Sequence, residues 1–482
     1  MAYPLLLDPY TSPATSPEQP FDRRALHPWM NRRPMPLSDP ETRYPELLQD
    51  TSGPRLAYLH IPFCANHCLF CGFYRNRTDD AAMSVYVDHL IREIERDAIR
   101  PGFSDRPVAA IFLGGGTPSA LSAIDLHRLI ATLRRCLPVA DDCEITVEGR
   151  VAGFDAEKID ACLDAGANRF SIGIQSFDTH LRRRMGRRAS QEEAIAFLAD
   201  LAARKRAAVI CDLIYGLPAQ TDDIWRRDVA LCDEIGLDGV DLYCLSLQPG
   251  SPLVLSIEKG ALPPAAETRD TERRYYEGGN ILEDRGWSRL SQAHWGRTPR
   301  ERNRYNRGTK RGLDCLAFGA GAGGMLGGHR FMLEGDVATY QARIAAGEKP
   351  ITAMLAPAPH HAARGLVMDA AEMGSLDFAS LDAAVDTEFS AALLPLFRHW
   401  QAVGVAALNG SRMTLTPRGR YWHNNVADVL FKLIDAYLDG PAVAHAPMSG
   451  DRMPVMAHSH SPDPTSEHPH AEHHSHRSGT PR

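Results

Sequence analysis

Short apolar runs alternate with amphipathic stretches between residues 55 and 245, and this alternation dominates the chain. The apolar runs have the length of buried strands: Leu56–Ile61, Val108–Leu113, Glu144–Glu148, Arg169–Ile174, Ala208–Ile214 and Gly239–Leu245. Helical periodicity lies between them, at Met83–Ile99, Ile124–Cys136, Gln191–Arg204 and Asp222–Ile235. Six strand–helix units predict an α/β fold with a parallel sheet. That number suits an open or partial barrel better than a closed eightfold barrel, although periodicity alone does not decide between them.

The pattern changes on both sides of this region. Ten prolines and little periodicity predict an irregular N-terminal arm. A helix candidate at Thr268–Asp284 precedes weakly periodic sequence, and a strand at Met413–Thr416 followed by a helix at Val426–Leu438 ends a mostly helical stretch. The predicted organisation is an arm (1–50), an α/β core (51–255), an Arg- and Gly-rich segment (256–345), a small, mainly helical, winged-helix-like domain (346–440) and a disordered His-rich tail (441–482).

Composition and charge exclude several classes of protein. Hydrophobic residues make up 44% and charged residues 23% of the 482 residues, which is typical of a globular protein. The net charge of −7 argues against a general nucleic-acid binder. No apolar run is long enough to cross a bilayer, and the N-terminus lacks the basic segment of a secretory signal. Ten cysteines are too dilute for a disulfide scaffold, so we expect a reducing cytoplasmic location.

Three of these cysteines, Cys64, Cys68 and Cys71, follow the first predicted strand with C-x3-C-x2-C spacing. Three thiolates on one loop can converge on a soft metal centre. A [4Fe–4S] cluster usually takes four cysteines, so three would leave one iron open for another ligand. The alternatives are a zinc site completed by His60 or His67, or cysteines that only fill a core.

This cysteine motif resembles that of the radical S-adenosylmethionine (SAM) superfamily, and the flanking residues are similar to enzymes of the oxygen-independent coproporphyrinogen III oxidase group over residues 55–430. The resemblance implies a radical SAM partial (β/α)6 barrel. It also implies two cofactors, a 4Fe-4S cluster and S-adenosyl-L-methionine. In such enzymes the three cysteines are the metal-binding and catalytic residues, and SAM occupies the fourth iron.

Further motifs follow the strands in the same order as in that group. The turn Leu113-Gly-Gly-Gly-Thr-Pro118 could let backbone groups approach a ligand, or it could be a tight corner with Thr117 as a helix cap. Taken singly, Glu148 could be a surface carboxylate, Gln175 a buried amide and Arg187 a solvated arginine. The resemblance implies these SAM contacts: Tyr58, Phe70, Gly115, Gly116, Thr117, Glu148, Gln175, Arg187, Asp212 and Cys244.

Departures from the group's pattern suggest a subfamily. The coproporphyrinogen dehydrogenases carry a fourth cysteine where this chain has Phe73. The haem-chaperone relatives also have Phe there, but the motif Cys71-Gly-Phe-Tyr-Arg-Asn76, together with Tyr305-Asn306-Arg307 and the Gly-rich segment 314–324, resembles the anaerobic haem-degradation radical SAM methyltransferases. This resemblance implies opening of the haem macrocycle without oxygen, release of iron and a methylated linear tetrapyrrole. The alternatives are coproporphyrinogen III dehydrogenase and a haem chaperone that keeps the cluster without turnover.

The expected partners are a haem-type tetrapyrrole and an electron donor, either flavodoxin-like or NADPH-dependent. Guanidinium groups pair well with carboxylates, so one interpretation of a basic segment is that it holds the haem propionates, and the other is that it is a solvated loop. Its members are Arg297, Arg300, Arg302, Arg304, Arg307, Lys310 and Arg311. His294 is a weaker candidate for an iron ligand, and a structural role is the more ordinary interpretation. Seven histidines between His458 and His476 could bind metal, although a solvated tail explains them as well.

Overall fold

The computed structural model describes residues 3–11, 20–21, 23–25, 27–28, 30–36, 40–49, 53–72 and 76–440. Within this part of the chain, a 12-stranded mixed sheet runs in the order β14-β13-β12-β11-β1-β4-β5-β6-β7-β8-β10-β9. Its parallel centre consists of β1 (Arg55–Ile61), β4 (Val108–Gly115), β5 (Val139–Gly149), β6 (Arg169–Gln175), β7 (Ala208–Tyr215) and β8 (Gly239–Cys244). These are the six strands that the apolar runs predict.

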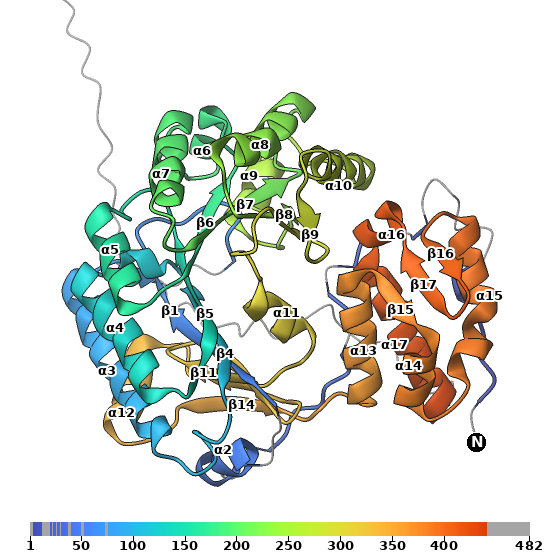
Figure 1. Cartoon of the computed structure of the whole chain (residues 1–482), viewed down its shortest axis with the longest axis horizontal. Helices are drawn as coiled ribbons and strands as arrows, with labels where there is room; N and C mark the ends of the chain where they lie inside the picture. Colours follow the sequence, from blue (N-terminus) through green and yellow to red (C-terminus); the bar gives the residue numbers. More distant parts are fainter. Residues whose placement is uncertain are drawn as a thin grey trace, which may run out of the picture. The chain divides into compact units, whose positions relative to one another are not determined.

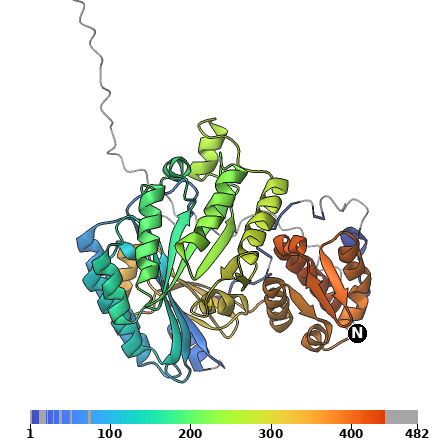
Figure 2. The same cartoon turned by 45° about the horizontal axis from the view of Figure 1, so that its top comes forward.

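Helices cover the outer face of the parallel strands, and the sheet curves around an inner face (Figures 1 and 2). They are α3 (Asp80–Ala98), α4 (Ala123–Cys136), α5 (Ala156–Ala165), α6 (Thr179–Arg184), α7 (Gln191–Ala203) and α8 (Asp222–Ile235). The prediction of a partial (β/α)6 barrel is therefore confirmed. The sequence interpretation did not include α5, although Asp155 caps its start and Gly166 its end.

Alternation along the strands divides apolar from polar side chains. Leu59, Val147 and Ile172 belong to the main hydrophobic core, which packs against the helices. Their neighbours in sequence point to the inner face, where several polar side chains lie: Tyr58, His60, Glu144, Thr146, Glu148, Arg169, Ser171, Gln175, Asp212 and Asp241. Because successive residues of a strand face opposite sides, one set of strands builds both the apolar core and a polar interior.

The remaining elements extend both edges of the barrel. At one edge β11 (Cys315–Phe318) pairs parallel to β1, and β12 (Gly323–Leu326), β13 (His329–Leu333) and β14 (Ile351–Leu355) continue antiparallel. At the other edge β10 (His294–Gly296) and β9 (Ser288–Arg289) follow β8. Short elements complete this part: β2 (Phe63–Cys64), β3 (Asn76–Arg77), a 3-10 turn (Pro118–Ala120), α9 (Pro252–Glu258), α10 (Thr268–Glu283), α11 (Arg304–Lys310) and α12 (Val337–Ala345).

Helix α11 closes part of the inner face. Tyr305 stacks on Tyr58 and Phe112, with ring centroids 6.2 and 4.8 Å apart. The carboxylate of Glu144 accepts the backbone N–H groups of Arg304 and Tyr305 at 3.1 and 3.2 Å. The interior polar residue Glu144 therefore satisfies the first turn of a helix that the topology places inside the barrel.

A buried lysine fixes the Gly-rich segment beside the barrel. The Nζ atom of Lys349 lies 2.8 Å from Glu93 and 2.6 Å from Asp97, and all three side chains are fully buried. Glu93 also accepts the backbone N–H of Gly319 at 2.9 Å. A Cβ atom on Gly319 would lie 2.5 Å from the carbonyl oxygen of His60, and φ is +96° there. Glycine is therefore required for this close approach.

The N-terminal arm is not irregular throughout, contrary to the sequence prediction. Residues Pro40–Gln49 form helix α2, and Tyr44, Leu47 and Leu48 lie in the main core. Burying such a side chain stabilises by about 1.5–3 kcal/mol, so three of them outweigh the cost of about 3 kcal/mol for Pro45 inside the helix. Upstream, α1 (Asp8–Thr11) is one short turn.

The C-terminal region has a hydrophobic core of its own. It contains α13 (His361–Met373), α14 (Phe378–Val385), α15 (Phe389–Ala402), α16 (Pro417–Tyr421), α17 (His423–Asp439) and a small sheet of β15 (Ser375–Asp377), β17 (Arg412–Leu415) and β16 (Ala406–Asn409). Helices followed by the β16–β17 hairpin and then by α16 and α17 give the predicted mainly helical, winged-helix-like arrangement. The tail lies outside the described residues.

Candidate active site at the strand ends

The three motif cysteines lie on one loop after β1. Cys64 and Cys68 are buried and Cys71 is half-buried, and none of the described cysteines forms a disulfide. The backbone N–H of Cys71 donates to the carbonyl of Cys68 at 3.0 Å, which folds the loop back on itself. Burial raises the pKa of the Cys64 thiol, while Thr117 and Arg150 lower it.

Two cationic side chains lie close to these thiols. Nη2 of Arg150 is 3.5 Å from the sulfur of Cys64. Arg187 is close enough to Cys68 and Cys71 to interact with both electrostatically, and its guanidinium carbon lies 5.7 Å from the centre of the Phe70 ring. Three thiols on one folded loop, with cations beside them, fit an iron–sulfur cluster, whose ligands are thiolates.

The glycine turn lies directly against the cysteine loop. A Cβ atom on Gly116 would lie 2.6 Å from the carbonyl oxygen of Phe63, and one on Gly115 would lie 2.8 Å from the His60 ring. Thr117 makes no capping hydrogen bond to the turn that follows it. Its hydroxyl lies 3.3 Å from the sulfur of Cys64 instead. The interpretation of this segment as a simple capped corner is therefore wrong.

Acidic side chains from β5 and β7 face the same space. Burial, and then repulsion from Asp212, raises the pKa of Glu148 to about 8. Burial and repulsion from Asp241 raise the pKa of Asp212 to about 7. The backbone N–H of Gly115 donates to Glu148. Shifts of this size mark carboxyl groups held without full compensation, which is common where a cationic or hydroxyl-bearing ligand binds.

Gln175 and Arg187 meet at the end of β6. A Cβ atom on Gly173 would lie 2.9 Å from Nε2 of Gln175 and 3.2 Å from Arg187, so both side chains lie directly beside Gly173. Gln175 has φ of +70°, a strained backbone conformation for a residue with a side chain. Nε of Arg187 is buried and has no hydrogen-bond partner among the described residues. A ligand carboxylate at this point would satisfy that buried donor.

The other two predicted SAM contacts differ in position. The hydroxyl of Tyr58 lies 3.0 Å from Nδ1 of His60, and its ring is part of the stack with Tyr305. Cys244 ends β8, but its polar neighbours are Arg24, Thr271 and Tyr215. None of these three belongs to the predicted set, so the structure does not bring Cys244 together with the other candidates.

Sequence reasoning missed two residues of this site. Asn66 donates to the carbonyl of Gly186 at 2.6 Å, which ties the cysteine loop to the loop after α6. Arg150, two residues after Glu148, donates to the carbonyl of Asn66 at 3.3 Å as well as approaching Cys64. The position of Asn66 between two cysteines was the one available signal, and nothing in the pattern distinguished Arg150 from other arginines.

Comparison with known proteins supports the assignment to a family. The model of the radical SAM superfamily matches residues 58–232. Anaerobilin synthase of Escherichia coli O157:H7 is 46% identical over 432 residues, which cover 88% of this chain and 95% of that protein. The chain belongs to the anaerobilin synthase family. As a radical SAM protein it uses a 4Fe-4S cluster and SAM, and the cysteine loop is the part of the structure that fits them.

More distant relatives of this anaerobilin synthase family member include the haem chaperones HemW of Synechocystis, at 30% identity over 58% of this chain and 68% of that protein, and of Escherichia coli K12, at 29% over 56% and 70%. Among solved structures, coproporphyrinogen III oxidase (HemN) of Escherichia coli matches with a TM-score of 0.70 and 22% identity, covering 85% of this chain and 97% of that one. That likeness shows the fold. Phe73, which the sequence interpretation used against the HemN reaction, lies outside the described residues.

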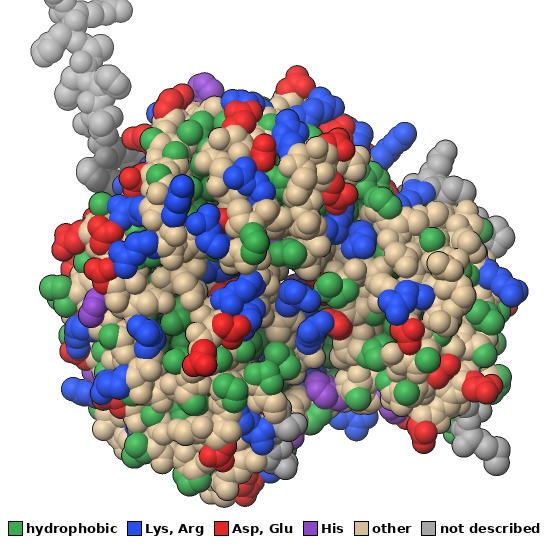
Figure 3. Space-filling model, in the orientation of Figure 1, with side chains coloured by type: hydrophobic (Ala, Val, Ile, Leu, Met, Phe, Trp, Pro, Cys, Tyr) green, Lys and Arg blue, Asp and Glu red, His purple; other side chains and the backbone are tan. Residues whose placement is uncertain are grey.

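The basic segment of this family member is mostly paired on the surface. Six of its cations each lie next to a carboxylate from another element: Arg297 with Asp233, Arg300 with Asp238, Arg302 and Arg304 with Asp142, Lys310 with Glu372 and Arg311 with Asp369. Figure 3 shows Lys and Arg side chains over α11 with acidic ones beside them. Arg307 differs, because its buried Nε has no hydrogen-bond partner among the described residues.

His294 is part of a buried ion-pair network in the barrel. Its ring nitrogens lie 2.9 Å from Asp241 and 3.1 Å from Glu301, and the Glu301 carboxylate pairs with Arg169 at 2.9 Å. Burial alone would lower the pKa of His294, but the two carboxylates outweigh it and raise the pKa to about 9. A protonated histidine between two carboxylates has no lone pair for iron, so the structural interpretation of His294 is favoured.

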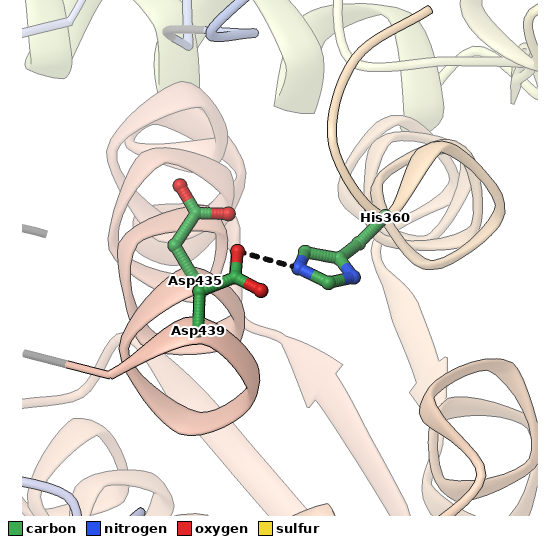
Figure 4. Close-up of side chains that lie close together, drawn as sticks. All are labelled: His360, Asp435 and Asp439. Atoms are coloured by element: carbon green, nitrogen blue, oxygen red, sulfur yellow. Dashed lines mark hydrogen bonds and ion pairs between the residues drawn. The ribbon is translucent and has the colours of Figure 1, made fainter. Parts of the chain in front are cut away.

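A second group of potential metal ligands lies in the C-terminal region, where His360, Asp435 and Asp439 face one another (Figure 4). His360 pairs with Asp439 at 2.8 Å. Asp435 pairs with the buried Arg364 at 2.5 Å. Each carboxylate therefore already has a partner, His360 for Asp439 and Arg364 for Asp435, and we interpret the group as a polar link between the start of α13 and α17. Among the described residues, no helix is long and apolar enough to cross a membrane.

Proposed function

We propose that this protein opens the haem macrocycle without oxygen, transferring a SAM-derived methyl group and releasing iron and a linear tetrapyrrole. The observation that carries the proposal is the 46% identity with anaerobilin synthase over 88% of the chain. The grouping of thiols, glycine turn and strand-end polar residues agrees with it. When bound, the cluster would supply the electron for reductive cleavage of SAM, and SAM would be the source of the reacting group.

The residues of the chain have separate roles in this proposal. Cys64, Cys68 and Cys71 hold the cluster. Arg187 donates its unpartnered Nε–H to the SAM carboxylate, since a buried guanidinium N–H without a partner binds a carboxylate strongly. Other SAM contacts come from β1, the cysteine loop, the glycine turn and the later strands, where these residues lie: Tyr58, Phe70, Gly115, Gly116, Thr117, Glu148, Gln175 and Asp212.

Haem contacts belong to the same proposal. Of the basic segment, Arg307 is the member we assign to a haem propionate, because the other six already have carboxylate partners. A flavodoxin-like or NADPH-dependent protein supplies the electron. We also propose a cytoplasmic location, where reducing conditions keep the cluster thiols free.

An anaerobic assay tests the function directly. Reconstituted full-length protein is mixed with haem, SAM and a low-potential reductant, and the Soret band is followed while products are analysed by mass spectrometry. Haem loss with a methylated linear tetrapyrrole is expected. Cys71→Ala should abolish SAM cleavage and haem loss, whereas Cys136→Ala, a half-buried cysteine at the end of α4, should retain both.

The HemW relatives make a haem chaperone the second candidate. Haem that binds stoichiometrically and is returned unchanged, in protein with an intact and reducible cluster, would overturn the degradation proposal in favour of the chaperone. Turnover of coproporphyrinogen in place of haem would overturn it in favour of the dehydrogenase.

A further inference from the structure

The loop after α6 lies directly against the cysteine loop. The side-chain amide of Asn66 donates to the carbonyl of Gly186 at 2.6 Å, and that carbonyl lies 4.0 Å from the sulfur of Cys68. The backbone N–H of Leu69 donates to the carbonyl of Met185 at 3.3 Å. Any protein that covers this loop therefore also lies next to the cysteines.

The same loop is rich in arginine, and its arginines divide into two kinds. Arg182 is buried and donates to the carbonyls of Ile174 and Ala189 at 2.8 Å, so it is structural. Arg187 faces the thiols. Arg183, Arg184 and Arg188 are exposed, and none of them forms an ion pair with any described residue. We call these three residues the exposed arginine patch.

Several other exposed arginines have ion-pair partners, although Arg92, Arg269 and Arg398 also form no ion pair with a described residue. Exposed arginines such as Arg135, Arg206 and Arg227 each pair with a carboxylate, at 2.7, 2.8 and 2.6 Å respectively. The acidic residues nearest to the patch in sequence are used for helix capping instead. Asp178 accepts the N–H of Leu181, and the carboxylate of Glu193 accepts the N–H of Ser190. Capping does not remove the charge of these carboxylates, but between residues 178 and 193 five arginines outnumber three carboxylates, so the segment keeps a net positive charge.

The patch is also close to the cysteines. Consecutive Cα atoms are at most about 3.8 Å apart, so the Cα atoms of Arg184 and Arg188 lie within about 7.6 Å of that of Gly186. Uncompensated charges within roughly a Debye length, about 8 Å at physiological ionic strength, act together on an approaching protein. On a chain with a net charge of −7, such a patch is a local exception.

We propose that the exposed arginine patch docks an acidic one-electron carrier protein of the flavodoxin type. The proposal rests on the proposed function only in assuming that the cysteines hold a cluster. In the docked complex one electron passes from the flavin hydroquinone to the oxidised cluster, leaving a flavin semiquinone and a reduced cluster. The patch contributes steering and docking, because complementary charge raises the rate of association and selects the partner.

A substrate role would require a different geometry. The polar residues proposed to contact SAM face the inside of the barrel, whereas α6 lies at the outer edge of the molecule (Figure 1). A haem bound inside the barrel would reach Arg187 before it reached exposed side chains of the α6 loop. Haem propionates are therefore the less favoured ligand of the patch, and the experiment separates the two.

The test compares two triple variants that remove the same charge. The patch variant is Arg183→Gln, Arg184→Gln and Arg188→Gln. The control variant is Arg135→Gln, Arg206→Gln and Arg227→Gln, which removes three exposed but paired arginines. The single variant Arg188→Gln gives a weaker form of the same test if the triple patch variant does not fold.

Binding of a bacterial flavodoxin to full-length protein is measured by titration at low and high salt, and cluster reduction by photoreduced flavodoxin is followed by stopped flow. We expect the patch variant to bind flavodoxin about tenfold to a hundredfold more weakly at low salt, with a smaller salt dependence and slower cluster reduction. The control variant should resemble the wild type, and dithionite-driven haem loss should be the same in all three proteins.

Several results would overturn the docking proposal. One is that both variants bind flavodoxin more weakly by the same factor, and another is that the patch variant binds it as tightly as the wild type. The others are that wild-type binding of flavodoxin does not depend on salt, and that the patch variant loses affinity for haem instead of for flavodoxin. Failure of the proposed function gives a different result. A wild-type protein that binds flavodoxin through the patch and accepts its electron, but leaves haem intact under dithionite, would retain the docking surface and lose the degradation activity.

Discussion

The network around His294 gives a pH-dependent contribution to stability that can be measured. His294 is fully buried between Asp241 and Glu301, and its pKa in the folded protein is raised from 6.5 to about 9. The folded state therefore holds a proton that the unfolded state releases near neutral pH. The resulting stability is fully present below pH 6.5 and is lost as the pH rises through about 9.

The shift of about 2.5 pKa units corresponds to about 3 kcal/mol, because one unit is about 1.4 kcal/mol. We expect the free energy of unfolding of the wild type to fall by about this amount relative to His294→Gln between about pH 6.5 and pH 9.5. Denaturant titrations of the two proteins at each pH give the difference. Comparing the two proteins removes the titration of groups on which His294 has no direct influence, such as Glu148.

His423→Gln is the matched control. His423 is also buried, but burial lowers its pKa to about 4, so it is neutral in the folded protein throughout this range. Its difference from the wild type should hardly change with pH. A His294→Gln difference that stays constant from about pH 6.5 to 9.5 would refute a protonated His294 between its two carboxylates.

Three further outcomes are expected. Lys349→Met leaves two buried carboxylates without their cation and should destabilise the protein by about 3–5 kcal/mol in denaturant titrations; a loss under about 1 kcal/mol would contradict the ion-pair network. Gly319→Ala places a Cβ atom 2.5 Å from the carbonyl oxygen of His60, so the iron content after reconstitution should fall, and full iron loading would show that the close approach is dispensable. Arg304→Ala removes a surface ion pair with the exposed Asp142 and should leave the haem KM and the melting temperature unchanged; a raised KM would return Arg304 to the propionate site.

Local sequence determined the central strands, most of their helices and the cysteine loop. Strands and amphipathic helices are recognisable because their burial follows periods that the chain displays directly. The spacing of Cys64, Cys68 and Cys71 identifies a metal loop because three ligands within eight residues need no distant partner. The missed helix α5 belongs here too, since Asp155 and Gly166 were available as start and stop signals.

Tertiary structure decided the features that depend on distant partners. Residues of the basic segment at 297–311 pair with carboxylates from other elements, such as Asp142 and Asp233, which no local pattern reveals. Helix α2 forms despite Pro45 because the main core buries its apolar side chains. Arg187 and Arg188 are neighbours in sequence, yet one faces the thiols and the other faces solvent. The sequence shows which side chains carry charge, but their partners lie on elements that only folding brings together.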